Sequence, residues 1–183
     1  MTSVESLLEG KRIVICAGSG GVGKTTTAAA LGLGMAERGL RVAVVTIDPA
    51  RRLATSLGLE ELGNEPRLVD PDRFAGHGVE ITGELWAMML DAKETFDEVV
   101  RRHAPDEESR ERVLNNRIYN QISNALAGSQ EYMAMEKLYE LHQEGRYDLL
   151  VLDTPPTRNA LDFLDAPRRL TEFVDSRSLQ LFA

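Results

Sequence analysis

Short apolar runs along the chain alternate with stretches in which apolar residues recur at helical spacing. The apolar runs are Arg12 to Ala17, Leu40 to Ile47 and Tyr147 to Leu152. Their nearly continuous apolarity and their β-branched residues are typical of strands buried on both faces of a parallel sheet. Thr25 to Arg38 is rich in Ala and Leu and is followed by Gly39, which predicts a helix between the first two strands. The order strand, loop, helix, strand indicates an α/β fold with a parallel sheet.

The long stretch between the second and third predicted strands is expected to be helical. Apolar residues have helical spacing over Thr82 to His103, Pro105 to Ala127 and Ser129 to Glu144, and Gly, Pro or Ser bounds each segment. We therefore predict a helical segment over residues 80–145, inserted within a single domain of residues 1–183. A further short helix is predicted after Pro167.

A glycine-rich segment lies directly between the first predicted strand and the helix. It reads Gly18-Ser19-Gly20-Gly21-Val22-Gly23-Lys24-Thr25 and is followed by Thr26. In a phosphate-binding loop, the glycines let backbone N–H groups turn around a polyphosphate, the lysine brings a positive charge to the β- and γ-phosphates, and the hydroxyl group is a ligand of Mg²⁺. Residues 18–26 are therefore predicted to bind a nucleotide, and Lys24 is also expected to act in catalysis.

Two aspartates follow the other predicted strands. Asp48 comes directly after Ile47, and Asp153 comes directly after Leu152. Because ligands bind at the carboxyl ends of the strands in an open parallel sheet, both carboxylates are expected beside the phosphate loop. Mg²⁺ prefers oxygen ligands and keeps several waters, so Thr25, Asp48 and Asp153 are its predicted protein ligands. Asp48 is also expected to orient the water that attacks the γ-phosphate.

The composition narrows the class of partner. The chain has 183 residues, of which 43% are hydrophobic, and a net charge of −8, which disfavours binding to nucleic acid or to an anionic membrane. Cys16 is its one cysteine and its three histidines are far apart, so neither a disulfide within the chain nor a structural zinc site is predicted. The N-terminus has no long apolar stretch, so no membrane span is expected and the cytoplasm is the expected location.

Three motifs together resemble those of the arsenite-pump and tail-anchored-protein-targeting ATPases. In order, the phosphate loop, switch I and switch II of that family match Gly20-Gly21-Val22-Gly23-Lys24-Thr25-Thr26, Asp48-Pro49-Ala50 and Asp153-Thr154-Pro155-Pro156-Thr157. The resemblance covers about Arg12 to Pro167. It implies a P-loop NTPase three-layer fold with a long helical insertion between the second and third strands.

The same resemblance implies an ATPase that uses ATP and Mg²⁺, with Asp48 as the water-activating residue. It also implies a homodimer, or a heterodimer with a related subunit, that holds nucleotides at its interface and handles a hydrophobic protein client or an anion cargo. In its sheet, the phosphate-loop strand would lie beside the Asp153 strand, with the Asp48 strand outside the Asp153 strand.

The sequence departs from this family in three respects. Ser19 stands where the family group usually has a signature lysine that reaches the partner's phosphate, so another cation is needed. Arg158 is the favoured candidate for this catalytic role, and the pair Arg51-Arg52 is the alternative. Cys16 alone cannot form the thiolate cluster that arsenite pumping requires. The family also continues well beyond the length of this sequence, so a truncated or naturally short form is expected.

Two other functions are compatible with the same loop. A phosphate loop does not specify the acceptor, so a ligase or kinase of small-molecule metabolism is one alternative. The missing signature lysine makes a nucleotide-dependent binding subunit with little turnover the other. The switch-like segment at Asp48 favours the ATPase.

Overall fold

The computed structural model describes residues 4–48, 51–126 and 130–156. The described chain divides into two compact units. Among the described residues, one unit, called the sheet unit below, contains those up to Asp91 and Leu138 to Pro156, and the helical unit contains Ala92 to Lys137. The helix predicted after Pro167 lies outside the described residues. The expectation of a single domain stays a prediction.

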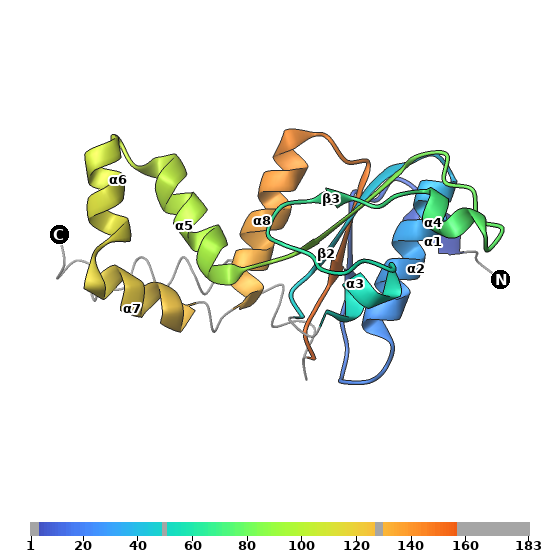
Figure 1. Ribbon diagram of the computed structural model, residues 1–183, viewed down its shortest axis with the longest axis horizontal. Helices are drawn as coiled ribbons and strands as arrows, with labels where there is room; N and C mark the ends of the chain where they lie inside the picture. Colours follow the sequence, from blue (N-terminus) through green and yellow to red (C-terminus); the bar gives the residue numbers. More distant parts are fainter. Residues whose placement is uncertain (1–3, 49–50, 127–129, 157–183) are drawn as a thin grey trace. The chain divides into compact units, whose positions relative to one another are not determined.

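The sheet unit is built on a five-stranded sheet with the order β1-β5-β2-β4-β3 (Figure 1). The strands are β1 (Ile13–Cys16), β2 (Arg41–Thr46), β3 (Arg67–Leu68), β4 (Glu84–Met89) and β5 (Leu149–Asp153). β1, β5, β2 and β4 pair in parallel, and β3 pairs antiparallel with β4. The predicted parallel sheet is confirmed, and the phosphate-loop strand does lie beside the Asp153 strand with the Asp48 strand next in order.

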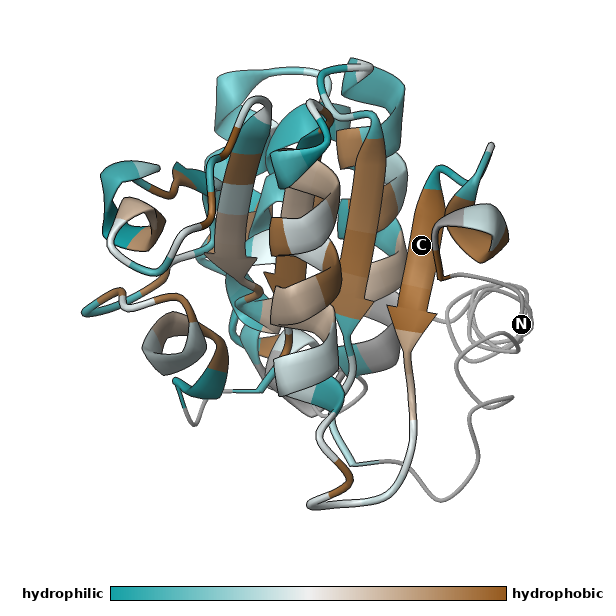
Figure 2. Ribbon diagram, turned by 90° about the vertical axis from the view of Figure 1, so that its right-hand side faces the viewer, coloured by the Kyte–Doolittle hydropathy of each residue, from teal (hydrophilic) through white to brown (hydrophobic). Residues whose placement is uncertain are grey.

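Helix α2 (Lys24–Glu37) packs against one face of this sheet. Figure 2 shows the hydrophobic residues gathered in the strands, with α2 crossing in front of them. The approach is close because Gly32 faces the sheet, where an added Cβ would lie 2.4 Å from Cγ2 of Val44. Three shorter helices also belong to the sheet unit, namely α1 (Val4–Leu8), α3 (Arg52–Ser56) and α4 (Asp72–Ala75), as does the last part of α8 (Gln130–Glu144).

The helix predicted from Thr82 to His103 is wrong over its first ten residues, Thr82 to Asp91. Glu84–Met89 forms strand β4, and a helix, α5, begins only at Ala92. The run from Leu85 to Leu90 is apolar throughout, so its periodicity cannot distinguish a strand from a buried helix. Gly83 favours the strand, because an added Cβ there would lie 2.2 Å from the Leu40 carbonyl oxygen. The helical segment predicted over residues 80–145 therefore starts later than expected, and β3 and β4 also lie between the second and third predicted strands.

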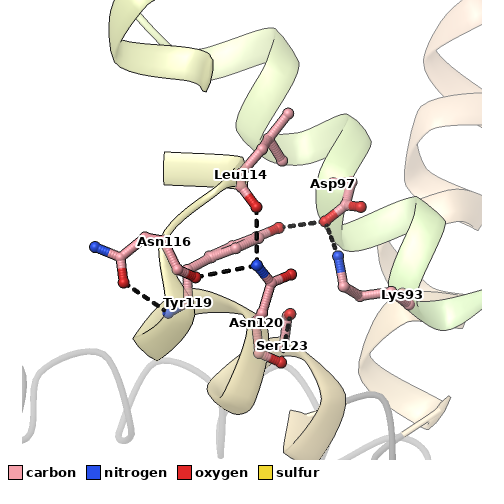
Figure 3. Close-up of polar contacts among 7 residues, drawn as sticks. All are labelled: Lys93, Asp97, Leu114, Asn116, Tyr119, Asn120 and Ser123. Carbon is pink, nitrogen blue, oxygen red and sulfur yellow. Dashed lines mark hydrogen bonds and ion pairs between the residues drawn. The ribbon is translucent and has the colours of Figure 1, made fainter. Parts of the chain in front are cut away.

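The helical unit contains α5 (Ala92–His103), α6 (Glu107–Leu114), α7 (Arg117–Leu126) and the first part of α8 (Gln130–Glu144). One helix was predicted where α6 and α7 occur, and Asn116 separates them because its Oδ1 accepts a hydrogen bond from the Ile118 N–H at 2.8 Å. Figure 3 shows how α7 is held to α5: the Tyr119 hydroxyl donates to Asp97 at 2.6 Å, and Lys93 pairs with the same carboxylate. None of the described helices is long and apolar enough to cross a membrane.

Candidate nucleotide-binding site

The glycine-rich segment forms a tight loop between the end of β1 at Cys16 and the start of α2 at Lys24. Gly21 and Gly23 have φ values of 78° and 93°. This is a left-handed backbone conformation that residues other than glycine rarely adopt. Gly23 is the residue that precedes the helix, and no side chain caps the helix there. The first N–H groups of α2 are therefore available to an anion, as in phosphate-binding loops.

Lys24 bends back over this loop in the structure. Its Nζ donates a hydrogen bond to the carbonyl oxygen of Ser19 at 3.0 Å. The positive charge of Lys24 is thus held close to the loop. The hydrogen bond that holds it is of moderate strength, because its acceptor is a neutral carbonyl oxygen and not a charged group.

Asp153 lies at the end of β5 and contacts Thr25 at the start of α2. Its side chain is fully buried, and its Oδ2 accepts hydrogen bonds from the hydroxyl groups of Thr25 at 2.8 Å and Thr46 at 2.9 Å. Its Oδ1 is buried and has no hydrogen-bond partner within the described part of the chain. Burial raises the pKa of this carboxyl group, while the two hydroxyl donors oppose the rise.

Asp48 follows β2 on the same edge of the sheet. Its backbone N–H donates to the Thr46 hydroxyl oxygen at 3.2 Å, and that hydroxyl group in turn donates to Asp153. The Asp48 side chain is 15% exposed, and its Oδ2 lies 3.5 Å from a guanidinium nitrogen of Arg52. Thr46 therefore links the two aspartates, which are the residues predicted to act on the metal and on water.

The ends of β1 and β5 are tied together by Thr154. Both its N–H and its hydroxyl group donate to the Cys16 carbonyl oxygen, at 3.2 Å and 2.9 Å. Pro156 then passes beside Gly20, where an added Cβ would lie 3.8 Å from the proline ring. These contacts keep Asp153 next to the phosphate loop.

Several of these groups line a cleft of about 390 Å³, whereas Asp153 and Thr46 are not among its lining residues. Its volume is within the range of small-molecule sites. The predicted site residues that line it are Gly21, Gly23, Lys24, Thr25, Thr26 and Asp48. Arg52, which was predicted only as part of an alternative pair, also lines it. The other lining residues were not predicted as site residues, and they are Thr55, Ser56, Thr154 and Pro156. Gly18, Ser19, Gly20 and Val22 complete the loop. Arg158, Pro49 and Ala50 lie outside the described residues.

The donor set at this cleft suits a magnesium ion bound together with a nucleotide. The described residues contain no group of three or more His, Cys, Asp or Glu side chains that could hold a metal ion. Mg²⁺ in such sites needs fewer, because it keeps several waters and takes phosphate oxygens as ligands. The unpartnered Oδ1 of buried Asp153 and the hydroxyl group of Thr25 are hard oxygen donors of the required kind.

Sequence reasoning did not identify Thr46, and it named Arg52 only as part of the alternative pair Arg51-Arg52. Thr46 is a β-branched residue inside a strand. A β-branched residue predicts a strand but does not predict a role in a binding site. Arg52 was considered with Arg51 as one pair, and nothing in the pattern separates the two. Only the fold shows that Arg52 lines the cleft and pairs with Asp48.

Comparison with known proteins gives the following matches. The family model described as "Anion-transporting ATPase" matches residues 11–180. The "Putative arsenical pump-driving ATPase 1" of Aquifex aeolicus is 31% identical over 160 residues, which cover 85% of this chain and 38% of that protein. The "ATPase GET3" of Malassezia globosa is 28% identical over 179 residues, which cover 93% of this chain and 49% of that protein.

Among solved structures, a chain of the "MinC:MinD cell division protein complex" of Aquifex aeolicus matches with a TM-score of 0.43 and 21% identity, and the match covers 86% of this chain and 52% of that chain. The chain thus spans less than half the length of both curated relatives.

Proposed function

Since the chain belongs to the anion-transporting ATPase family, we propose that it binds ATP with Mg²⁺ in the cleft and hydrolyses the ATP to ADP and phosphate. The observation that carries this proposal is the hydrogen bond from Thr25 to Asp153, two residues that are 128 positions apart. It brings a hydroxyl group at the start of α2 onto a carboxylate at the end of β5. A phosphate loop, a hydroxyl group and a carboxylate in this arrangement are what a P-loop NTPase uses to hold Mg²⁺ and phosphates.

In this proposal the residues of the loop bind and orient the triphosphate. Lys24 leaves the Ser19 carbonyl oxygen for the β- and γ-phosphates, and backbone N–H groups of the loop and of the first turn of α2 receive phosphate oxygens. Thr25 and Asp153 would hold Mg²⁺, together with Asp48 either directly or through water. When bound, the ion neutralises charge on the phosphate oxygens.

Asp48 orients the attacking water in the proposed hydrolysis. The water oxygen forms a bond to the γ-phosphorus while the bond from that phosphorus to the β,γ-bridging oxygen breaks. The bridging oxygen keeps the electron pair and leaves on ADP, and the water protons pass to phosphate and solvent. Because such a transition state needs mainly positioning and charge neutralisation, no covalent nucleophile is required. The catalytic role of Arg158 stays a prediction.

At the level of the whole protein, we propose a cytoplasmic switch that cycles between dimer states as ATP is bound and hydrolysed. A related subunit or a second copy would supply the other half of the dimer, and the cargo would be a hydrophobic protein or an anion. Membership of the family supports this part of the proposal, and the chain itself spans less than half of its curated relatives.

Two substitutions test the proposed ATPase. Lys24→Ala should abolish ATP binding, because the loop loses its side-chain cation. Asp48→Asn should bind ATP at least as tightly as the unmodified chain and lower the rate of phosphate release by at least about 10²-fold. Calorimetry with Mg²⁺ and ATP measures binding, and a phosphate-release assay measures turnover. Lys11→Ala is the matched control, because Lys11 is exposed and does not line the cleft.

The outcomes separate the candidate functions. An unmodified chain that binds neither ATP nor GTP contradicts the proposal. Phosphate transfer that requires an added small-molecule acceptor would instead support a kinase or ligase. Tight binding without measurable turnover would support the nucleotide-dependent binding subunit, which the serine at position 19 favours. Equal loss of binding in Lys24→Ala and Asp48→Asn would remove the separate role of Asp48.

A further inference from the structure

The cleft has a second cation besides Lys24. The basic residues among its described lining are Lys24 and Arg52, and the acidic one is Asp48. Position 19, where related ATPases usually carry a lysine, holds a serine. We propose that Arg52 is the residue that contacts the γ-phosphate of ATP from within the same chain, and that it exchanges Asp48 for this phosphate when ATP binds.

The fold directs Arg52 toward the cleft. Arg52 is the first residue of α3 and follows Arg51. Arg51 has a φ of 56° and is the only non-glycine residue with a positive φ in the described part of the chain. This left-handed residue turns the chain directly before α3, and such conformations concentrate at ligand-binding segments. From α3, Arg52 pairs with Asp48, while Thr55 and Ser56 of the same helix line the same cleft.

The present partner of Arg52 holds it only weakly. The Arg52 side chain is 61% exposed, and its guanidinium Nη1 lies 3.5 Å from Asp48 Oδ2. An ion pair with so exposed a partner contributes little to stability. A γ-phosphate offers more negative charge than one carboxylate and can accept two hydrogen bonds from a guanidinium group. The exchange of Asp48 for phosphate is therefore favourable once a triphosphate is in place.

The exchange would also remove the contact of Arg52 with the Asp48 carboxylate, which is proposed to orient water. While Arg52 is paired with Asp48, the guanidinium group competes for the carboxylate that should orient water. Transfer of Arg52 to the γ-phosphate removes that competitor and adds a cation where negative charge must be stabilised during phosphoryl transfer. Arginines supplied within the same chain act in this way in other P-loop enzymes.

This inference rests on the proposed ATPase function and adds a specific expectation about nucleotide preference. A residue that contacts only the γ-phosphate stabilises bound ATP and not bound ADP. Arg52→Ala should therefore weaken ATP binding by about 10-fold or more while it changes ADP binding by less than about 3-fold. It should also lower kcat by about 10²-fold. Arg52→Lys should recover part of the ATP affinity but less of kcat, because a lysine cannot form the bidentate contact.

The control for charge and fold is Arg51→Asn. It removes the same charge from the adjacent position, and asparagine tolerates the left-handed conformation of Arg51. This variant should bind both nucleotides like the unmodified chain. Arg158→Ala tests the competing assignment, because the sequence analysis favoured Arg158 as the catalytic cation.

A double-mutant cycle distinguishes the proposed exchange from a structural role of Arg52. Asp48→Asn removes the carboxylate that competes for Arg52, so it should tighten ATP binding more in the presence of Arg52 than in the Arg52→Ala background. Equal effects in the two backgrounds would contradict the exchange. An unchanged ratio of ATP to ADP affinity in Arg52→Ala, or a loss of kcat confined to Arg158→Ala, would overturn the role of Arg52.

The failure of this inference can be told from the failure of the proposed function. If the unmodified chain binds and hydrolyses ATP, and Lys24→Ala does not, the proposed function stands whatever Arg52→Ala does. If the unmodified chain binds no nucleotide, the proposed function fails and the role of Arg52 fails with it.

Discussion

The hydroxyl group of Thr46 has a central place in the site, because it contacts both switch aspartates. It donates to the buried carboxylate of Asp153 and accepts from the backbone N–H of Asp48. A buried carboxylate with too few donors is costly, so each of its hydrogen bonds matters. Thr46 therefore positions groups that are proposed to act on Mg²⁺ and water, although it does not line the cleft.

Substitution of Thr46 tests this dependence. Thr46→Val keeps the shape of the side chain and removes both hydrogen bonds, so it should lower the free energy of unfolding by about 1–3 kcal/mol. It should also weaken binding of ATP in the presence of Mg²⁺. Urea denaturation and calorimetry measure the two effects. Thr46→Ser keeps the hydroxyl group and should recover most of the ATP affinity; a Thr46→Val variant that binds as well as Thr46→Ser would contradict the positioning role.

At the scale of single residues, the sequence predicts those groups that belong to a motif or end a strand. Lys24 follows from the spacing of the phosphate loop, and Asp48 and Asp153 follow from their positions after apolar runs. Thr46 and Arg52 could not be predicted in the same way, because their contacts depend on how distant segments meet. The distance between Asp153 and Thr46 is set by the pairing of β5 with β2, which no local pattern specifies.

At the scale of elements, α2 connects the phosphate loop to the sheet through small residues. Ala28, Ala29, Gly32 and Ala36 of α2 are buried, and the helix therefore approaches the strands closely. Polar and apolar residues are not clearly separated on two faces of α2, so its sequence does not indicate which residues face the sheet. Val44 and Leu85 lie directly opposite Gly32.

Two glycines of α2 give a matched test of this packing. Gly32→Ala should destabilise the protein by about 1–3 kcal/mol, because the new Cβ would lie 2.4 Å from Val44 Cγ2 in a packed core. Gly34→Ala should be neutral or stabilise by up to about 1 kcal/mol, because its Cβ would meet only Arg38 at 3.7 Å and alanine favours helices. Thermal or urea unfolding measures both. The same sign for both substitutions would contradict this account of the helix.

Prediction of elements failed where an apolar run had no internal contrast. β4 and a helix are equally compatible with the apolar residues from Leu85 to Leu90, and the close contact of Gly83 with Leu40 that favours the strand is a tertiary contact. α6 and α7 were joined in the prediction because both carry helical periodicity. The cap at Asn116 that separates them involves a polar side chain, which is also common on helix surfaces.

At the scale of the whole molecule, the topology of the sheet was more predictable than its division into units. Parallel pairing follows from the crossover connections, and the order β1-β5-β2 agrees with the family resemblance. The boundaries of the two units at Asp91 and Leu138 could not be predicted, because they fall beside β4 and within α8. A continuous helical pattern contains no signal for a boundary between compact units.

The proposed dimer cycle makes a prediction for the whole molecule. Val22 in the phosphate loop is 62% exposed, and a dimer that holds nucleotides at its interface is expected to cover it with the partner. ATP would then bind the dimer better than the monomer and shift the equilibrium toward it by mass action. The Asp48→Asn variant keeps ATP unhydrolysed, so with Mg²⁺ and ATP its mass should rise from about that of the 20.2 kDa chain to twice that value.

Sedimentation velocity measures this change directly. ADP should give less dimer than ATP, because the cycle requires the two nucleotides to favour different states. Lys24→Ala should stay monomeric with either nucleotide, since it lacks the cation that binds the phosphates. A chain that remains monomeric while saturated with ATP would contradict the dimer cycle but would leave the proposed ATP site intact, because binding and assembly are measured separately.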